Sequence, residues 1–535
     1  MVASPLVTVL LLVPPAAFAL VAALAATAPG RRPRAVLRLL TPLTLLALAG
    51  AAAAASLVVA RGAVESPALG AGLLTASLRL DALSAPLLVL VSLLGAIVLR
   101  FSRHYLDGDA RHGAFLGQLA LTVGAALLLV MAGTLTFLLT MWIASSLALH
   151  RLLRFYADRR GAVTAARKKF VVARVADVAL TGAGVLLADA FGTVHIGTIL
   201  AGAQEMAGTP SAIPTQLHAA VALLVLAAAF KSAQFPTHGW LVDVMEAPTP
   251  VSALLHAGLL NAGPFLILRL APVLLLSPGA RVALLALALL TALTMALSMA
   301  AQTRIKTALG YSSAAHMGFS LALSALGLFP LALLHLVAHS CYKAHAFLRS
   351  GSAVEPARTG TTLGLDGPLA PGAVAGAIAV SVALVAAASR LAGGTVAHAG
   401  ALLGLAALLA IGLVPLLARG FDHGGTGVMQ PLLASGAVAC AFFLLERAVT
   451  AVPSSLLPMT PAPDAASQLL LATAVCLGAV AVWLPLIGAR GALASLWTRL
   501  YLRARNGWYA NVRFDAVVGS YRTTRPLTLA SELPE

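Results

Sequence analysis

Long apolar runs dominate this sequence and leave few folds open to it. About fifteen runs come near the roughly 20 residues that a helix needs to cross a bilayer, with short polar loops between them. Hydrophobic residues make up 60% of the 535, charged residues only 10%, and the mean hydropathy is +0.95. These values exclude a soluble globular protein. The sequence predicts an all-α polytopic membrane protein with about 14 to 15 transmembrane helices.

The distribution of charge predicts how the chain lies in the membrane. We expect a single transmembrane helical bundle over residues 1–489 and a basic, amphipathic tail over residues 490–535. The net charge of +17 comes largely from short basic loops between apolar runs, which is the positive-inside pattern and does not indicate nucleic-acid binding. The most basic loop contains Arg151, Arg154, Arg159, Arg160, Arg167, Lys168 and Lys169. This pattern predicts a multi-pass protein of a bacterial inner membrane, with its N-terminus outside and its tail in the cytoplasm.

A lysine beside an apolar run is the first candidate for a functional group. Lys231 follows about a dozen nearly unbroken apolar residues, where an ionisable side chain is costly in a bilayer. Pro248 and Pro250 then interrupt the backbone. We therefore predict a broken helix near Lys231 to Pro250, of the kind that lines wet cavities in transporters. The alternative is that Lys231 lies near a helix end and extends its ammonium group to the lipid headgroups.

Three further ionisable residues recur at a helical spacing in a later run. His335, His339 and Lys343 are four residues apart, so they lie on one face of a helix. Stacked exchangeable groups of this kind fit an intramembrane proton relay. One alternative is a polar seam buried against neighbouring helices. Another is a metal site in HLVAH, but the glutamate of HExxH is absent and no third ligand has a suitable spacing, so we predict no metal in this chain.

Five other ionisable residues are candidates for the same pathway. Arg174 and Asp177 are three residues apart on a predicted helix, and we expect them to form an ion pair near the cytoplasmic interface, at the entry of the path. Asp243 and Glu246 lie beside the predicted break and are either loop carboxylates or part of the site. His256, in SALLHAGLL, is by itself typical of a hydrogen-bonded core histidine.

The order of these motifs resembles a known family. Lys231, the PTPVSALLHAG segment, TRIKTALGYSSAAHMGF and HLVAHSCYKAHAFLRSGS are together similar to the antiporter-like proton-translocating subunits, over residues 81–351. This superfamily contains the L subunit of respiratory complex I and the A subunit of Mrp sodium/proton antiporters. The resemblance implies that the proton pathway includes Lys231, His256, Lys306, His335, His339 and Lys343.

The sequence departs from the family pattern in two places. Family members carry a glutamate directly after the tryptophan of the fifth span, as partner to the lysine, whereas here Trp142 is followed by Ile143. The family's broken twelfth helix is also absent, since VALVAAASRLAGG offers only Arg390. The lysine of the seventh span thus lacks its usual counter-charge. The candidates to replace it are Asp177, Asp243 and Glu246.

One branch of the family resembles this chain further. SSLALHRLLRFYADRRGAVTAARKKFVVARVADVAL is similar to the membrane subunits of DAB-type inorganic carbon accumulation complexes. This resemblance implies an energy-coupling subunit that conducts H⁺ or Na⁺, is not itself an enzyme and holds no cofactor. It also implies a cytoplasmic DabA-type partner, similar to a zinc β-carbonic anhydrase, which carries the zinc and hydrates carbon dioxide. The alternatives are a pumping or antiporter subunit of a complex I, hydrogenase or Mrp-type assembly, and a structural anchor.

Overall fold

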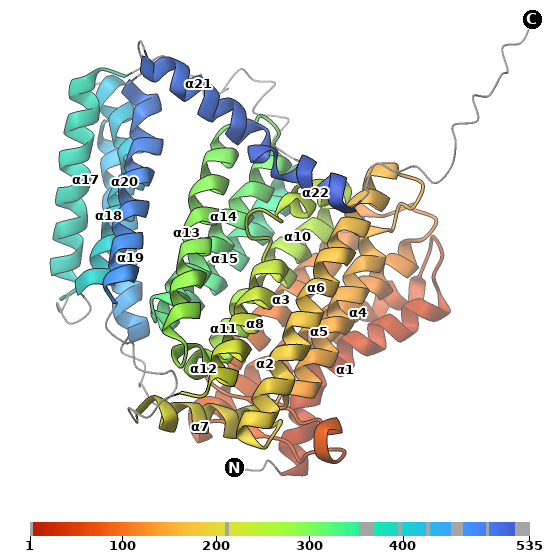
Figure 1. Ribbon diagram of the computed structural model, residues 1–535. Coiled ribbons are helices and arrows are strands. Elements are labelled where there is room, and N and C mark those ends of the chain that lie inside the picture. Colours follow the sequence, from red (N-terminus) through yellow and green to blue (C-terminus); the bar gives the residue numbers. More distant parts are fainter. Residues whose placement is uncertain are drawn as a thin grey trace, which may run out of the picture.

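The computed structural model is a bundle of long helices (Figure 1). It describes residues 4–208, 213–351, 369–393, 399–423, 428–450, 464–487 and 492–518. Among these residues, 12 helices are long and apolar enough to cross a membrane. α8, α14 and α15 lie beside them in the bundle but are shorter or more polar. The predicted all-α membrane fold is confirmed, and the predicted count is met when these three helices are included.

The first half of the bundle contains six long helices and a small hairpin. These helices are α1 (Pro5–Thr27), α2 (Arg34–Arg61), α3 (Ser84–Tyr105), α4 (His112–Val130), α5 (Leu135–Leu153) and α6 (Arg160–Phe191). Strands β1 (Val64–Glu65) and β2 (Arg79–Leu80) pair antiparallel between α2 and α3. α7 (Ile196–Gly208) lies across the end of the bundle near the N-terminus (Figure 1).

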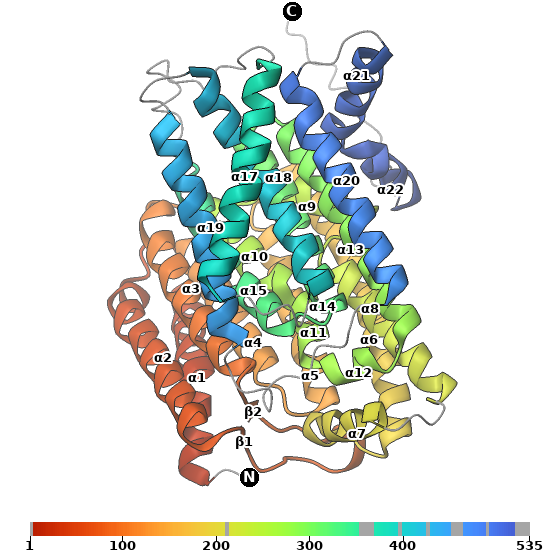
Figure 2. The same ribbon diagram turned by 90° about the vertical axis from the view of Figure 1, so that its left-hand side faces the viewer.

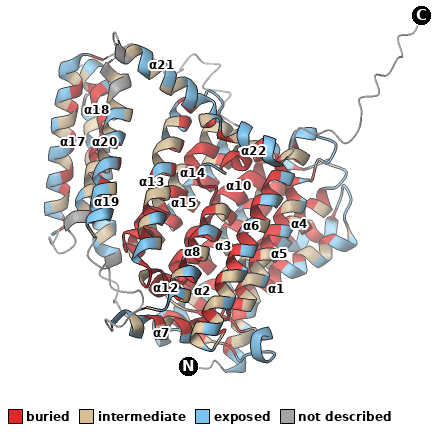
Figure 3. Ribbon diagram, viewed as in Figure 1, coloured by how far each residue is buried: buried red, intermediate tan, exposed pale blue. Residues whose placement is uncertain are grey.

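The middle of the chain is broken into short helices. They are α8 (Thr215–Lys231), α9 (Gly239–Asp243), α10 (Thr249–Ala257), α11 (Ala262–Arg269) and α12 (Ala271–Leu275). Three longer helices follow: α13 (Pro278–Ala300), α14 (Ile305–Ala325) and α15 (Phe329–Arg349). Buried residues are concentrated along this part of the chain, notably in α10 (Figure 3).

The predicted break at the lysine is confirmed, although its cause differs from the prediction. α8 ends at Lys231, and the chain turns at Ala233, whose φ is 53°. Pro248 and Pro250 do not interrupt a helix: they stand at the start of α10, where a missing N–H group costs nothing. A second interruption, the 3₁₀ turn Leu259–Asn261 between α10 and α11, was not predicted.

The basic stretch before the sixth span is helical rather than a loop. α6 begins at Arg160 and runs for 32 residues, about ten residues earlier than the apolar pattern indicates. Lys168 and Lys169 are only 2% and 5% exposed, so they are buried groups and not simply charges facing water. The basic stretch that we predicted to orient the protein in the membrane therefore contains two buried lysines with partners inside the protein.

Four further helices form a group beside the main bundle (Figures 1 and 2). They are α17 (Pro371–Leu391), α18 (Ala399–His423), α19 (Met429–Thr450) and α20 (Ala465–Ile487). Their apolar faces share a core that includes Val374, Val414, Leu417 and Phe443. α17 is continuous, as expected from the absence of the family's break.

The basic tail lies across the end of the bundle opposite the N-terminus (Figure 1). α21 (Ala492–Arg505) extends from the outer group to α22 (Ala510–Val518), which packs against α6 and α9. At this contact the Lys168 ammonium donates to Asp243 Oδ2 at 2.5 Å and also forms an ion pair with Asp515. Asn511 completes the cluster, 3.3 Å from the same ammonium. The tail is thus attached to the broken-helix segment by buried charge.

Removing the negative charge of Asp515 is expected to loosen α22. Asp515 is 1% exposed, and losing a buried charged hydrogen bond costs about 1.5–3 kcal/mol. In Asp515→Asn, amide hydrogen exchange in α22 should speed up by about tenfold or more. Arg513→Ala, an exposed change in the same helix, is the control and should leave exchange unchanged. Equal exchange in the two variants would contradict this attachment.

A second charge network holds the broken segment at the other end of the bundle. Arg269, at the end of α11, donates to Asp81 at 2.6 Å and to the Val130 carbonyl at 3.2 Å. Arg79 donates to the same carboxylate at 3.1 Å. Burial acts to raise the pKa of Asp81, but the charges of Arg269 and Arg79, with hydrogen bonds from Ser84, hold that pKa well below its usual value.

Neutralising Asp81 is therefore expected to destabilise the fold strongly. Asp81→Asn leaves the buried Arg269 guanidinium without its counter-charge, which costs about 3–5 kcal/mol. Because the pKa is lowered in the folded state, the stabilisation is present at neutral pH and is lost as the pH falls below about 4. Thermal unfolding of the detergent-solubilised protein measures both effects. The exposed Asp158→Asn serves as control, and a melting temperature equal to this control would contradict the network's role.

Candidate functional site

Lys231 ends α8 against the indole ring of Trp142 from α5. Its Nζ lies 4.1 Å from the ring centroid and donates to the Trp142 carbonyl at 3.4 Å. From the edge of the ring, Trp142 Nε1 donates to Asp177 Oδ1 of α6 at 3.0 Å. Asp177 also pairs with Arg174 at 2.6 Å, as the three-residue spacing predicts. Trp142 thus links the lysine to a buried, arginine-paired carboxylate.

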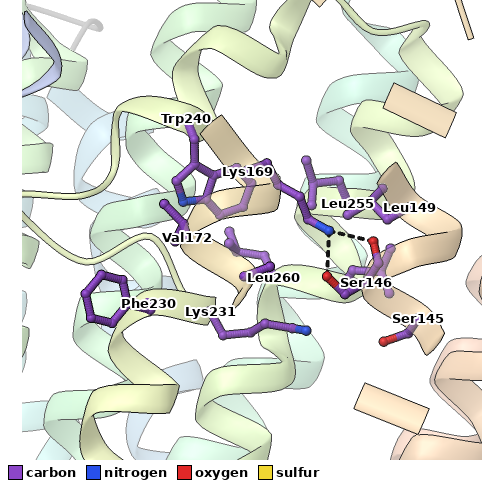
Figure 4. A pocket seen from close by; sticks show the side chains of 12 residues that line it. Ser145, Ser146, Leu149, Lys169, Val172, Phe230, Lys231, Trp240, Leu255 and Leu260 are labelled. Atoms are coloured by element: carbon purple, nitrogen blue, oxygen red, sulfur yellow. Dashed lines mark hydrogen bonds between the residues drawn. The ribbon is translucent and has the colours of Figure 1, made fainter. Parts of the chain in front are cut away.

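A small cavity opens beside Lys231 (Figure 4). The space open to the centre of a water molecule is about 20 Å³, enough for about one water. Lys169 and Lys231 both extend into it toward the serines of α5 (Figure 4). Lys169 Nζ donates to the Ser146 carbonyl at 2.7 Å and to Ser146 Oγ at 2.8 Å. Two lysines from different helices therefore share one internal cavity.

The three carboxylates proposed as counter-charges to Lys231 have different surroundings. Asp177 interacts electrostatically with Lys231 and is joined to it through Trp142. Asp243 is paired with Lys168 instead, and Glu246 is exposed at the end of the break. Among the ion pairs of the described residues, none includes Lys231. Asp243 and Glu246 are therefore wrong as partners of the lysine, because they lie toward α22 and the surface.

α10 separates the lysine cavity from a second polar region. Leu255 faces the cavity, whereas the neighbouring His256 stacks on Phe347 of α15, with ring centroids 4.4 Å apart. His256 is fully buried and its ring nitrogens have no hydrogen-bond partner among the described residues. The prediction that His256 is a hydrogen-bonded core histidine is therefore wrong, since its ring is held by stacking.

Lys306, in the first turn of α14, donates to Thr249 of α10 at 2.9 Å.

The predicted face of α15 is present and meets histidine and serine side chains of α14. Lys343 is completely buried and donates to Ser312 Oγ at 2.7 Å and to the Leu309 carbonyl at 3.1 Å. His335 and His339 lie one turn apart, with ring centroids separated by 6.0 Å. His316 of α14 lies between them, 5.3 Å from the first ring and 5.1 Å from the second.

The structure corrects the prediction that no third ligand accompanies the two histidines. Ring nitrogens of His316, His335 and His339 all lie within 4.8 Å of one another. His316 lies 19 residues before His335 and on another helix, so spacing within a single helix could not identify it. Lys169 was missed for a similar reason: in sequence it resembles an orienting charge. A histidine inside an apolar run was the available signal for His316.

The comparisons with known proteins agree with this architecture. Residues 132–387 match the family described as NADH:quinone oxidoreductase/Mrp antiporter, and residues 70–116 match the N-terminal region of complex I chain 5. The Mrp complex from Dietzia sp. has a similar fold, with a TM-score of 0.57 and 24% identity over 96% of this chain and 56% of that one. The family matches confirm the resemblance to antiporter-like subunits seen in the motifs, and the Mrp complex shows a similar fold.

Two curated relatives show which branches of the family this chain resembles. The probable inorganic carbon transporter subunit DabB2 of Halothiobacillus neapolitanus is 45% identical over 56% of this chain and 54% of that protein. NADH-quinone oxidoreductase subunit L of Mycobacterium tuberculosis is 36% identical over 52% of this chain and 43% of that protein. The chain therefore spans about half the length of these relatives in each match. The resemblance to DabB subunits predicted from the sequence is confirmed.

Proposed function

We propose that this chain is a cation-conducting, energy-coupling membrane subunit of an inorganic carbon uptake complex. The observation that carries the proposal is the arrangement of Lys231, Trp142 and Asp177 beside the break after α8. An ionisable group in a membrane bundle that is near a cavity and has a defined partner is typical of ion pathways. The relative named as an inorganic carbon transporter subunit supports the substrate class.

The strength of the Lys231 contacts suits a group whose charge changes during a transport cycle. An ammonium group on an indole face gains about 0.5–2 kcal/mol. A direct buried ion pair is far harder to break, at about 3–5 kcal/mol. Lys231 has this weaker contact and a hydrogen bond to the Trp142 carbonyl, while the Asp177 carboxylate is bound at the indole N–H. An arriving cation can therefore displace the Lys231 ammonium from this position without breaking a direct buried ion pair.

The second half of the proposed path runs through α10, α14 and α15. From the cavity, it passes His256 and reaches Lys343, which interacts electrostatically with that histidine. The histidines of α15 continue along the same face, and Lys306 stands at the start of α14 beside α10. Imidazole and amine groups exchange protons, so these groups suit H⁺ transfer. Na⁺ would instead use oxygen ligands, which the hydroxyls of Thr249 and Ser312, the Leu309 carbonyl and water offer on the same path.

The carbon chemistry is assigned to a partner in this proposal. The partner is a cytoplasmic DabA-type subunit, similar to a zinc β-carbonic anhydrase, and it contributes the zinc. We place α21 and α22 on the cytoplasmic face of a bacterial inner membrane, where their basic residues are available to the partner. Because α22 is joined to α9 through Lys168, movement at the break would reach the surface on which the partner docks.

Uptake of labelled inorganic carbon by cells tests the proposal. Cells that lack carbonic anhydrase would express the chain together with a DabA-type soluble subunit. We expect uptake that needs both proteins and stops when the H⁺ or Na⁺ gradient is collapsed, with separate ionophores identifying the ion. Uptake that survives loss of both gradients would contradict energy coupling.

A respiratory or antiporter role is the second candidate, favoured by the relative named NADH-quinone oxidoreductase subunit L. This role predicts that the chain co-purifies with redox or Mrp subunits from its native membrane. Ile143, at the position of the family's glutamate, argues against it because it removes the direct lysine–carboxylate pair. Co-purification with a large soluble zinc protein would support carbon uptake instead.

A further inference from the structure

We propose that His316, His335 and His339 form a binding site for a divalent transition metal of the Zn²⁺ class. The three rings come from the facing helices α14 and α15, and their ring nitrogens lie within 4.8 Å of one another. His339 is 4% exposed, and the other two are partly buried. The site is thus built by packing between two helices.

The unpaired ring nitrogens point to a ligand. His335 Nε2 and both nitrogens of His339 are buried and have no hydrogen-bond partner among the described residues. A neutral imidazole has one donor and one acceptor nitrogen, and buried polar atoms are normally paired. A proton shared between two rings would satisfy one pair, whereas a metal ion accepts a lone pair from each of three rings at once. A metal ion would therefore engage one nitrogen on each of the three rings, whereas a shared proton joins only two rings.

The donor set and its dimensions define the class of metal. Imidazole suits Zn²⁺, Co²⁺, Ni²⁺ and Cu²⁺, whereas Mg²⁺ and Ca²⁺ need oxygen ligands. At Zn–N distances of about 2.0–2.1 Å, tetrahedral ligand nitrogens are about 3.4 Å apart. The rings would close by roughly 1.4 Å, by side-chain rotation on their helices. Three histidines leave a fourth position for water.

Bound metal would oppose the transport route, and this consequence rests on the proposed function. The nitrogens that bind the metal are those that would pass a proton along α15. Lys343 interacts electrostatically with His316 and His339, and its ammonium is held away by Ser312 and Leu309. Metal and mobile cation therefore compete for the same region, and Zn²⁺ should inhibit uptake.

Cobalt titration of the purified full-length chain in detergent tests the site without transport. Tetrahedral Co²⁺ bound by three imidazoles gives visible absorption bands, and Zn²⁺ should displace it. We expect His316→Ala and His335→Ala to weaken Co²⁺ binding by at least about tenfold. His345→Ala is the matched control, since this histidine is exposed on the same helix, and it should bind like the wild type.

The outcomes separate the metal site from the transport proposal. Thermal unfolding without metal establishes that each variant is folded, and added Zn²⁺ should raise the unfolding temperature of the wild type and of His345→Ala only. No bands in the wild type, or equal bands in all variants, would overturn the site. If the Co²⁺ bands are lost in His316→Ala and His335→Ala but Zn²⁺ does not inhibit uptake, the metal site stands. That result would count against the transport route along α15.

Discussion

Replacing Lys231 with methionine is expected to lower gradient-driven carbon uptake by about a hundredfold or more, the scale of a lost proton-transfer group. Methionine preserves the length and apolar stem of the side chain, so the fold should persist while the exchangeable charge is lost. Lys231→Arg sharpens the experiment because arginine keeps the cation–π contact but does not release its proton. We expect the arginine variant to be inactive as well. Labelled-carbon uptake, normalised to the amount of protein in the membrane, measures both.

The control for this series is Arg167→Met, which removes an exposed charge from α6. It should retain uptake, because surface charge acts mainly on solubility and association. Full activity in Lys231→Arg but not in Lys231→Met would show that only a fixed positive charge is required. Full activity in both would remove Lys231 from the pathway.

The second large effect is expected from Asp177→Asn. The asparagine oxygen can still accept the Trp142 hydrogen bond, which spans 3.0 Å, so the change isolates the negative charge. Without this charge the Lys231 ammonium faces Arg174 and Lys169 uncompensated, and uptake should fall by about ten- to a hundredfold. Asp189→Asn is the matched control, since Asp189 is an exposed acid on the same helix. Equal uptake in the two variants would contradict the role of Asp177.

We propose that Asp177 takes the place of the missing family glutamate. Ile143 stands where the family has an acid, directly after Trp142. The indole N–H of Trp142 instead donates a hydrogen bond to a carboxylate of α6, that of Asp177. Lys231 lies over the face of the indole ring, and Asp177 lies at its N–H edge. We propose that this arrangement holds Lys231 less tightly than a direct buried ion pair would. The departure from the family pattern is a rearrangement of charge and not its loss.

Periodicity and hydropathy were sufficient to predict much of this molecule. Spans of about 20 apolar residues predict the fold because an isolated helix must satisfy its own backbone in lipid. The α15 face and the Arg174–Asp177 pair follow from spacing on one helix. The break after Lys231 was predicted for the wrong reason, because prolines at a helix start resemble prolines inside one.

The remaining site residues depend on tertiary packing. His316 joins His335 and His339 only because α14 packs against α15. Lys169 resembles a surface charge until α5 places Ser146 beneath it. Asp243 pairs with Lys168, which also pairs with Asp515 of the tail, and no local pattern indicates that docking. Contacts between distant segments thus decided which ionisable groups became partners.

The most direct test measures cation movement through Lys231 itself. Membrane vesicles would contain the chain with its soluble partner, under an imposed H⁺ or Na⁺ gradient, with an ion-sensitive dye inside. Addition of inorganic carbon should start a cation flux in the wild type and in Arg167→Met, and the flux should be at least about a hundredfold smaller in Lys231→Met. A flux in Lys231→Met equal to that of the wild type would contradict the account.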